Sequence, residues 1–309
     1  MTIPGKTRSF LAAARVANLP GVASHATTGC LLAWWLLPSV AGGPATTPWP
    51  WGTIALAAAA GVLLCIAGNL LNDWHDHAWD ARHRPERALP AGHFHPATFF
   101  VLGSTSLIAG VAMMFFANAS SGLVALAIAA CVAVYTRMHK RALWTVVPLA
   151  MCRALLPWMG ALAVHGGAPA FHDPGWWIIA AFGTALFAWT CGLSLDARGE
   201  STGGGGPALA PWLLLAAAPL IPLPWLTPRF PLPWLGLLPA ILWLGIVRGP
   251  YRHTAKQRVS ALLAGLPLLD LAVLIPACHL AAAGHTWMSW IPLLAFALGR
   301  QLQRTAAAT

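Results

Sequence analysis

Long apolar stretches separated by short polar segments dominate the chain. Ten of them predict membrane helices, because about 20 apolar residues match the thickness of a bilayer. Their approximate ranges are 20–42, 51–74, 96–117, 120–138, 144–165, 175–195, 208–226, 232–248, 257–283 and 286–301. The last one is short and could instead be a re-entrant or interfacial piece. The pattern predicts an all-α, polytopic bundle of nine to ten membrane helices, forming one domain over residues 1–309.

The composition favours a membrane protein over a soluble one. The chain is 58% hydrophobic and 8% charged, whereas soluble domains carry about 25% charged residues. Its six Cys are scattered singly through apolar stretches, without the spacing of a disulfide framework or a zinc site. No signal peptide is evident in the first 19 residues, which have no long apolar core. We expect most of the apolar surface to face lipid.

The net charge of +10 comes from basic residues in short clusters between the apolar stretches. This distribution argues against a nucleic-acid partner and follows the rule that Lys and Arg collect in cytoplasmic loops. With ten spans and the N-terminus inside, sixteen of the eighteen basic residues fall on one side. Six of the eight acidic residues gather in two loops on that same side. We predict an integral protein of a bacterial inner (plasma) membrane, with both acidic segments facing the cytoplasm.

The first acidic segment follows the second predicted helix. If that helix continues, Asp73, Asp76 and Asp80 stand at i, i+3 and i+7 and share one face. Carboxylates this close repel one another unless a cation lies between them. Mg²⁺ is the natural choice, with phosphate oxygens completing its shell and Asn72 as a neutral ligand or donor. A solvated loop of mixed charge is the plainer interpretation. Five nearby His (75, 77, 83, 93 and 95) raise a Zn or Ni alternative, but their spacing does not form one compact ligand set.

The same segment resembles the first signature of the UbiA superfamily of intramembrane prenyltransferases. It reads Asn72-Asp73-Trp-His-Asp76-His-Ala-Trp-Asp80, then Arg84-Pro-Glu-Arg87-Ala-Leu-Pro90-Ala-Gly92; the family pattern is NDxxDxxxD followed by a Pro- and Gly-containing turn. The resemblance implies a ring of helices around a central cavity and Mg²⁺-dependent transfer of a prenyl group from a prenyl diphosphate to an acceptor. Asp73, Asp76 and Asp80 would hold metal. Asn72, Arg84 and Arg87 would bind the diphosphate.

The second family signature, usually DxxDxxxD, is incomplete here. The chain reads Leu193-Ser-Leu-Asp196-Ala-Arg198-Gly-Glu200. The resemblance implies that Asp196 and Glu200 also hold metal, whereas Leu193 replaces an acidic residue and Arg198 intrudes. After the fourth helix the family commonly shows YxxxK. Lys140 follows Tyr135 at one residue longer spacing and is a further candidate for the diphosphate. Cys152-Arg153 in the fifth predicted helix, Ala-Arg-Gly-Glu-Ser at 197–201 and Leu-Leu-Asp at 268–270 resemble a divergent branch that includes a protein of ebo gene clusters.

Two intramembrane charges leave alternatives open. Arg153 lies within the fifth predicted helix, where a charge is costly and usually faces a cavity or a partner. It either binds the diphosphate or forms a structural pair with Asp270, the single acidic residue in the interior of a predicted span. Most Trp residues are expected in interfacial belts. Trp74 and Trp79 could instead line a prenyl tunnel and stabilise an allylic cation.

Three functions remain in view. The first is a prenyltransferase acting on an allylic prenyl diphosphate, an acceptor of unknown identity and Mg²⁺. The second is a non-catalytic membrane protein that binds a prenyl lipid or metabolite, linked to small-molecule export. The third is a secondary transporter, which would predict an internal repeat that the two halves of the chain do not show.

Overall fold

The computed structural model describes residues 5–37, 49–140, 142–201, 209–227, 233–251, 255–280 and 286–305. In these ranges the chain is built of helices and turns, without a β-strand. The α-helices are α1 (Gly5–Ala13), α2 (Leu19–Leu36), α3 (Trp51–His75), α4 (His77–His83), α5 (Pro96–Ala117), α6 (Ala119–Met138), α7 (Val146–His165), α8 (Pro174–Ser201), α9 (Leu209–Ala217), α10 (Leu223–Leu226), α11 (Leu238–Arg248), α12 (Ala255–Gly265), α13 (Leu268–Leu280) and α14 (Trp290–Thr305). Short 3-10 helices are η1 (Val16–Asn18), η2 (Leu143–Thr145), η3 (Ala218–Leu220), η4 (Pro233–Leu237) and η5 (Thr286–Ser289).

Seven helical stretches within the described ranges are long and apolar enough to cross a membrane. They are Trp51–His75, Pro96–Ala117, Ala119–Met138, Leu143–His165, Pro174–Arg198, Leu209–Leu226 and Lys256–Cys278. A further apolar stretch, Pro233–Arg248, is shorter. The all-α membrane fold predicted from the sequence is confirmed, whereas the count of nine to ten spans is not.

The helix predicted over 257–283 is interrupted. It consists of α12 and α13, with a break of two residues at Leu266 and Pro267. Proline has no backbone N–H and clashes with the preceding turn, so it ends a regular helix. The break allows α13 to change course, and it brings Leu266 to the wall of a cavity described below.

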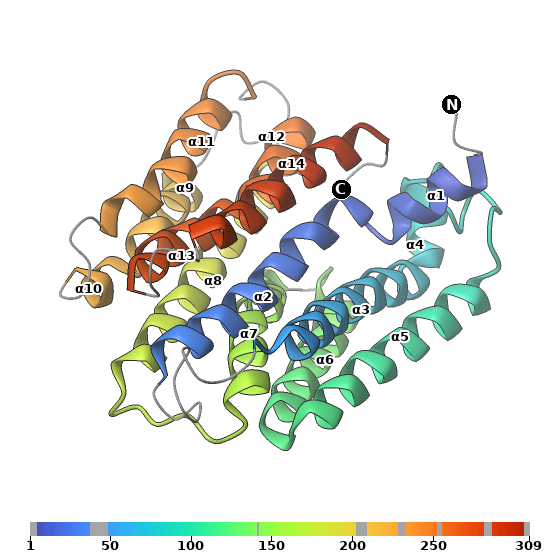
Figure 1. Ribbon diagram of the computed structural model, residues 1–309. Helices are drawn as coiled ribbons and strands as arrows, with labels where there is room; N and C mark the ends of the chain where they lie inside the picture. Colours follow the sequence, from blue (N-terminus) through green and yellow to red (C-terminus); the bar gives the residue numbers. More distant parts are fainter. Residues whose placement is uncertain are drawn as a thin grey trace.

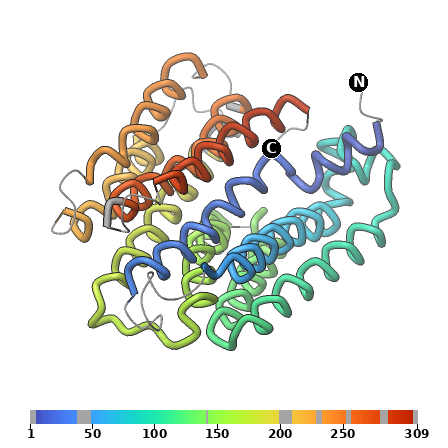
Figure 2. Tube along the Cα trace, in the orientation of Figure 1, coloured from blue at the N-terminus to red at the C-terminus, as the bar shows by residue number. Residues whose placement is uncertain are grey.

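The helices form one bundle in which α2, α7 and α8 are central. Helix α7 packs against α2, α6 and α8, while α3 packs against α2, α5 and α6. Figures 1 and 2 show α3, α5 and α6 on one side of α2, and α9, α11 and α14 on the other. Between the two groups, α8 packs against α12 and α13.

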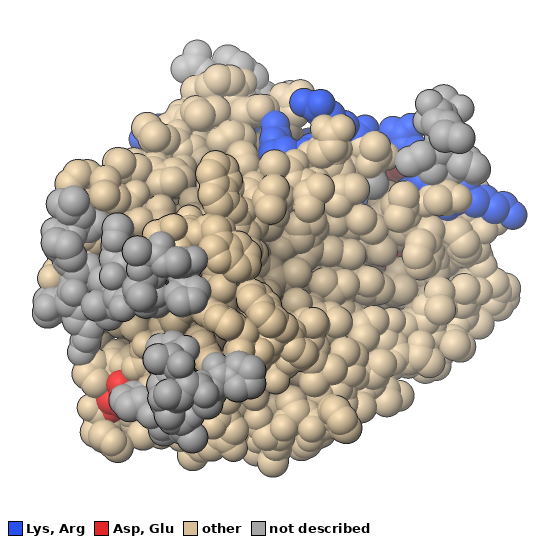
Figure 3. Space-filling model, viewed as in Figure 1, with Lys and Arg blue, Asp and Glu red and all other residues tan. Residues whose placement is uncertain are grey.

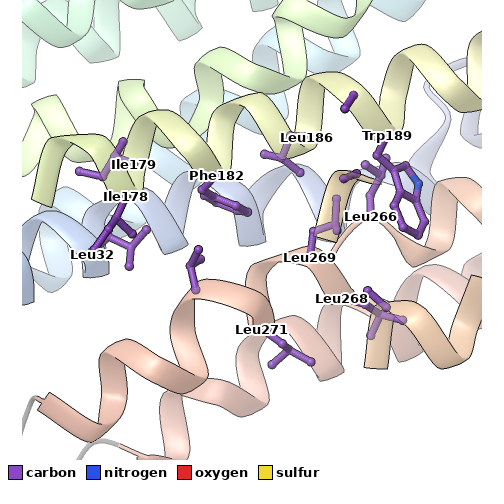
Figure 4. Packing of buried hydrophobic residues seen from close by; sticks show 14 of the residues in the cluster. Leu32, Ile178, Ile179, Phe182, Leu186, Trp189, Leu266, Leu268, Leu269 and Leu271 are labelled. Atoms are coloured by element: carbon purple, nitrogen blue, oxygen red, sulfur yellow. The ribbon is translucent and has the colours of Figure 1, made fainter. Parts of the chain in front are cut away.

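The buried face of α8 forms the largest apolar cluster. Figure 4 shows Phe182, Leu186 and Trp189 of α8 turned towards the α12–α13 corner. The indole N–H of Trp189 donates to the carbonyl oxygen of Leu262 at 3.0 Å, so its polar atom is satisfied inside the core. Because lipid tails are as apolar as these side chains, close packing rather than water exclusion holds such helices together.

Two glycines set the distance between α2 and α7. A Cβ on Gly29 would collide with the backbone carbonyl of Pro157, and one on Gly160 with that of Ala26. The two contacts are reciprocal, so each helix presents its glycine to the other's backbone. Small residues at such positions let membrane helices approach closely. Helix α2 is thereby fixed against the helix that carries Arg153.

The outer surface is apolar around the middle and charged at one end. Helix α5 exposes residues such as Ile108 and Phe116, as expected for a surface in lipid. On the face shown in Figure 3, Lys and Arg gather at the end where α1 lies, and acidic atoms appear at the opposite end. This one-sided distribution is the one that the positive-inside rule predicts for an integral membrane protein.

Candidate active site

The first acidic segment lies at the junction of α3 and α4. Asp76 stands between the two helices, but the helical bonds continue: its N–H donates to the carbonyl of Asn72 at 2.9 Å, and the N–H of Asp80 donates to the carbonyl of Asp76 at 2.8 Å. Asp73, Asp76 and Asp80 are all buried, with exposures of 8%, 4% and 2%. The predicted continuation of the helix therefore holds, apart from a single turn at Asp76.

Each of these carboxylates has a cationic partner. Nη1 of Arg87 lies 2.9 Å from Asp80 Oδ2 and 3.2 Å from Asp73 Oδ1. Lys140 Nζ lies 2.8 Å from Asp76 Oδ1, and His139 Nε2 lies 3.0 Å from Asp76 Oδ2. The mutual repulsion expected from the sequence is therefore offset by the protein's own side chains. The pairing of Lys140 with Asp76 is visible only in the three-dimensional fold, because the two residues lie far apart in the sequence.

The pKa of Asp76 reflects this pairing. Burial alone would raise the pKa, but hydrogen bonds from His139 and Lys140 outweigh burial and lower it to about 2, from an ordinary 3.8. Asp76 is therefore a firmly ionised carboxylate, ready to bind a cation. Sequence reasoning missed His139, although it stands next to Lys140.

The segment after α4 places Arg87 through local packing. Ala88 and Leu89 are buried against Phe99 of α5, and the N–H of Ala91 donates to the carbonyl of Arg87 at 2.9 Å. Gly92 ends the turn with φ of +70°, a conformation that a residue with a Cβ rarely adopts. The turn that resembled the family signature is thus a small anchored loop that holds its guanidinium over α3 and α4.

Trp74 and Trp79 do not line a tunnel. Both are exposed, at 39% and 40%. Trp79 lies under Lys140, whose Nζ is 4.0 Å from the ring centroid. Trp74 packs against Phe100 with ring centroids 4.8 Å apart. The tunnel interpretation was wrong, and Trp79 instead helps to hold Lys140 beside Asp76.

Arg15 is a site residue that sequence reasoning did not select. Its φ of 49° and ψ of 50° are left-handed, which is uncommon for a residue with a side chain. Its guanidinium donates to Asn69 Oδ1 at 3.0 Å, and Asn69 Nδ2 donates to the carbonyl of Ala14 at 3.1 Å. This strained turn aims a positive charge at α3 near the acidic segment. The available signal was the Arg15-Val-Ala-Asn18 stretch before the first long helix.

The site opens into two adjoining cavities. An inner cavity of about 380 Å³ is walled by α2, α3, α6, α7, α8 and α12, and most of its lining side chains are apolar, among them Leu64, Leu156 and Leu263. An outer cavity of about 640 Å³ adds charged groups. We call the outer cavity the vestibule; its charged lining residues are Arg8, Arg15, Asp73, Arg84, Glu86, Arg87 and Lys256. The two share Arg15, Arg84, Arg87, Ala197 and Val259. Together they offer a charged entrance and an inner cavity whose wall combines apolar side chains with arginines.

Arg153 lines the inner cavity, and it does not pair with Asp270. The structure gives Asp270 other partners on α2: Ser24, His25 Nδ1 at 2.7 Å and Thr28 Oγ1 at 3.1 Å. The Arg153–Asp270 pair is therefore wrong. Because its expected counter-ion is taken, the guanidinium of Arg153 faces a cavity in which the described lining residues include no carboxylate.

The second acidic segment is arranged differently from the first. Asp196 and Arg258 are almost fully buried, and Arg258 Nε donates to Asp196 Oδ2 at 2.7 Å. Leu193 lines the inner cavity. Arg198 donates to the carbonyl oxygens of His139 and Ala142. Glu200 belongs to α8, but its side chain lies outside the described part of the structure.

The two segments differ in their fit to Mg²⁺. In the first, Asn72 Oδ1 is buried without a hydrogen-bond partner, and Asn72 Nδ2 donates to Asp76 at 3.4 Å. This hard, oxygen-only donor set suits Mg²⁺. Among the described residues no three His, Cys, Asp or Glu side chains are arranged to hold a metal, and Arg87 and Lys140 occupy carboxylate oxygens of this segment. In the second, Asp196 is already neutralised and does not fit a metal.

Comparison with protein families now decides what the chain is. The model of the UbiA prenyltransferase family matches residues 32–266. The chain belongs to this family. The match includes both acidic segments and five of the helices that wall the inner cavity, α3, α6, α7, α8 and α12, together with the end of the sixth, α2. No curated protein sequence matches the chain.

One solved structure shares the fold, and two UbiA homologues superpose less closely. A digeranylgeranylglyceryl phosphate synthase superposes with a TM-score of 0.58 at 17% identity, covering 89% of this chain and 99% of the synthase. A UbiA homologue from Aeropyrum pernix K1 in the apo state gives 0.49 at 18% identity, covering 94% and 98%. A homologue from Archaeoglobus fulgidus bound to DMAPP and Mg²⁺ gives 0.46 at 15% identity, covering 95% and 98%.

Proposed function

We propose that this protein transfers a prenyl group from an allylic prenyl diphosphate to an acceptor, within the membrane and with Mg²⁺. The observation that carries the proposal is the shape and charge of the paired cavities. A vestibule lined by five basic residues, with Asp73 of the first acidic segment in its wall, suits a diphosphate, and the apolar part of the inner cavity suits a hydrocarbon tail. Membership of the UbiA prenyltransferase family supports the same reaction.

The residues of the first acidic segment and its cations divide the work. Asp73, Asp76 and Asp80 hold Mg²⁺, and Arg84 and Arg87 bind phosphate oxygens, a geometry for which guanidinium groups are suited. Asn72, Lys140 and Arg153 complete the set of groups that contact the diphosphate. When bound, Mg²⁺ neutralises charge that develops on the leaving diphosphate. Glu200 stays a candidate through its place in the family signature.

The bonds between carboxylates and cations imply an exchange of partners. In the structure, Arg87 and Lys140 are bonded to carboxylates that are proposed metal ligands. Arg87 and Lys140 would have to leave these carboxylates for Asp73, Asp76 and Asp80 to hold Mg²⁺, and both side chains could then bind phosphate oxygens of a diphosphate. Metal and diphosphate should therefore bind cooperatively, each favouring the arrangement that the other needs.

The reaction itself breaks one bond and forms another. The allylic C–O bond breaks with its electron pair leaving on the diphosphate, the allylic carbon bonds to the acceptor, and the acceptor releases a proton. Arg84 and Arg87 stabilise charge on the departing group. The apolar part of the inner cavity wall, including Leu64 and Leu156, excludes water that would otherwise react with the allylic carbocation.

Release of inorganic diphosphate tests the proposal. Purified protein in lipid nanodiscs is incubated with Mg²⁺, labelled prenyl diphosphates of several lengths and a membrane extract as the source of acceptors. We expect a labelled apolar product and equimolar diphosphate from the wild type, and neither from Asp73→Asn. The control is Asp173→Asn, which changes an acidic residue at the opposite end of the bundle. Tight binding of the prenyl diphosphates without any release would favour the non-catalytic binding protein.

A further inference from the structure

The second acidic segment has turned away from the substrate cavities. Asp196 and Arg258 are exposed by only 3% and 2% and bond to each other at 2.7 Å. Neither lines the inner cavity or the vestibule, although their chain neighbours Ala197 and Val259 line both. The carboxylate of Asp196 is thus directed at a guanidinium on α12 behind the cavity wall. Asp76 and Asp80 are also buried and paired, but their partners Arg87 and Lys140 are 20% and 29% exposed and can turn to another anion. The side chain of Arg258 is only 2% exposed. Breaking a buried ion pair by drawing away one partner is strongly unfavourable, so the Asp196 oxygen is not available to a metal.

The other positions of the segment serve packing and loop placement. Leu193 contributes an apolar side chain to the cavity wall. Arg198 donates to the carbonyl oxygens of His139 and Ala142, each at 3.2 Å, and to Thr145 Oγ1 at 3.0 Å. These bonds tie α8 to the loop that presents Lys140 to Asp76. The segment therefore braces the first metal site instead of forming a second one.

The cavity supplies fixed positive charge in return. Arg15, Arg84, Arg87, Arg153 and Arg198 line the inner cavity, whose described lining includes no Asp or Glu. A guanidinium binds phosphate oxygens through paired donors and keeps its charge at all relevant pH values. Arginines thus line the space in which a diphosphate would need neutralising, whereas the second acidic segment contributes no described carboxylate to it.

We infer that this protein handles its diphosphate with one divalent cation, held by the first acidic segment, and with arginines in place of a second. The inference rests on the proposed function and deepens it. It follows that Asp196 is a positioning residue, acting through Arg258 and α12, and not a metal ligand.

Counting bound Mn²⁺ tests this directly. Full-length protein in nanodiscs is saturated with geranyl S-thiolodiphosphate, an unreactive analogue, and titrated with Mn²⁺ while bound metal is followed by electron paramagnetic resonance. We expect one Mn²⁺ per wild-type protein. The number should be unchanged in Glu200→Gln and in the double variant Asp196→Asn/Arg258→Gln, which keeps a neutral hydrogen-bonding pair. Asp73→Asn should lose it.

Several results would overturn the inference. Two Mn²⁺ in the wild type, falling to one in Glu200→Gln, would show a working second site while leaving the proposed function intact. Tight binding of the analogue without any Mn²⁺ would equally exclude a one-metal site. If the analogue does not bind at all, the proposed function fails and the inference with it. The wild-type and Glu200→Gln measurements decide the matter even if the double variant does not fold.

Discussion

At the scale of single residues, the acidic segment is a set of matched charges. From the sequence, removal of one of three crowded carboxylates would relieve repulsion and leave stability unchanged or raised. The structure reverses that expectation for Asp76, which is bonded to Lys140 and His139. The spacing of the three Asp residues in the sequence thus predicted that they share one face, but it did not predict that His139 and Lys140 pair with Asp76. Arg87 belongs to the same segment, but His139 and Lys140 come from the turn after α6, and helical periodicity contains no information about such distant neighbours.

Asp76→Asn should therefore destabilise the protein at neutral pH. The pKa of Asp76 is about 2 in the folded state against an ordinary 3.8, so the folded state favours the ionised form. The stabilisation is complete above about pH 4 and is lost as pH falls towards 2. A shift of this size corresponds to about 2 kcal/mol. Thermal unfolding in mild detergent between pH 2 and 7 should show the gap between wild type and variant closing over this window.

Glu86→Gln is the matched control for this experiment, because Glu86 is an exposed acidic residue nearby. Its unfolding midpoint should follow the wild type at every pH. If Asp76→Asn is as stable as the wild type at pH 7, the ion pairs with Lys140 and His139 contribute nothing, and the exchange of partners proposed for substrate binding loses its basis.

Arg153→Gln isolates the binding role of the intramembrane arginine. Because Asp270 is bonded elsewhere, neutralising Arg153 breaks no known ion pair, and the midpoint of unfolding should move little. A hydrogen bond between charged groups contributes about 1.5–3 kcal/mol, so affinity for the geranyl S-thiolodiphosphate should fall by at least about tenfold. Arg137→Gln, at the exposed end of α6, should bind normally. Unchanged affinity in Arg153→Gln would remove Arg153 from the site.

At the scale of helices, the apolar pattern predicted that a helix exists more accurately than it predicted where the helix begins and ends. The helix expected over 96–117 is α5 with the same bounds, whereas 208–226 contains α9, η3 and α10. The Pro-rich composition of that stretch explains why it is not one helix. Pro267 likewise explains why the helix expected over 257–283 is divided into α12 and α13. The stretch expected to extend to residue 42 is α2 as far as Leu36, and positions 38–48 lie outside the described residues. Hydropathy reports the length of an apolar stretch, but it does not report where the backbone turns within it.

Helices α2 and α13 are joined by a buried polar cluster whose shared acceptor is Asp270. Its carboxylate is fully buried and is hydrogen-bonded to Ser24, His25 and Thr28. Interhelical hydrogen bonds in membranes contribute about 0.6 kcal/mol each on average, so Asp270→Ala, which removes all of them, should cost about 2 kcal/mol. The measurement is the free energy of unfolding in mixed micelles.

The control for this prediction is Asp173→Asn. Asp173 accepts the N–H of Gly175 at the start of α8, and Asn is an equally good residue at such a position, so stability should be retained. A loss in Asp270→Ala no larger than in the control would show that packing alone holds α2 against α13.

At the scale of the whole molecule, both acidic segments face one end of the bundle. Asp73 and Glu86 line the vestibule together with Ala197 of α8, while Asp173 lies between α7 and α8 at the other end. The distribution of Lys and Arg in the sequence predicted this sidedness without any structure. The mutual arrangement of α3 and α8 around one cavity needed the fold, because no local pattern specifies which helices become neighbours.

Orientation in the membrane follows from the same asymmetry and can be measured. In a background without reactive cysteines, Glu86→Cys and Glu200→Cys should react with a membrane-impermeant maleimide only after the cells are opened, and Asp173→Cys should react on intact cells. The reason is that the positive-inside rule predicts a cytoplasmic location for the basic end. Labelling of all three positions from one side would contradict the bundle, because Asp173 and Glu86 lie at its opposite ends. Labelling of positions 86 and 200 from opposite sides would separate the acidic segments by a bilayer, and no single diphosphate site could then contain both.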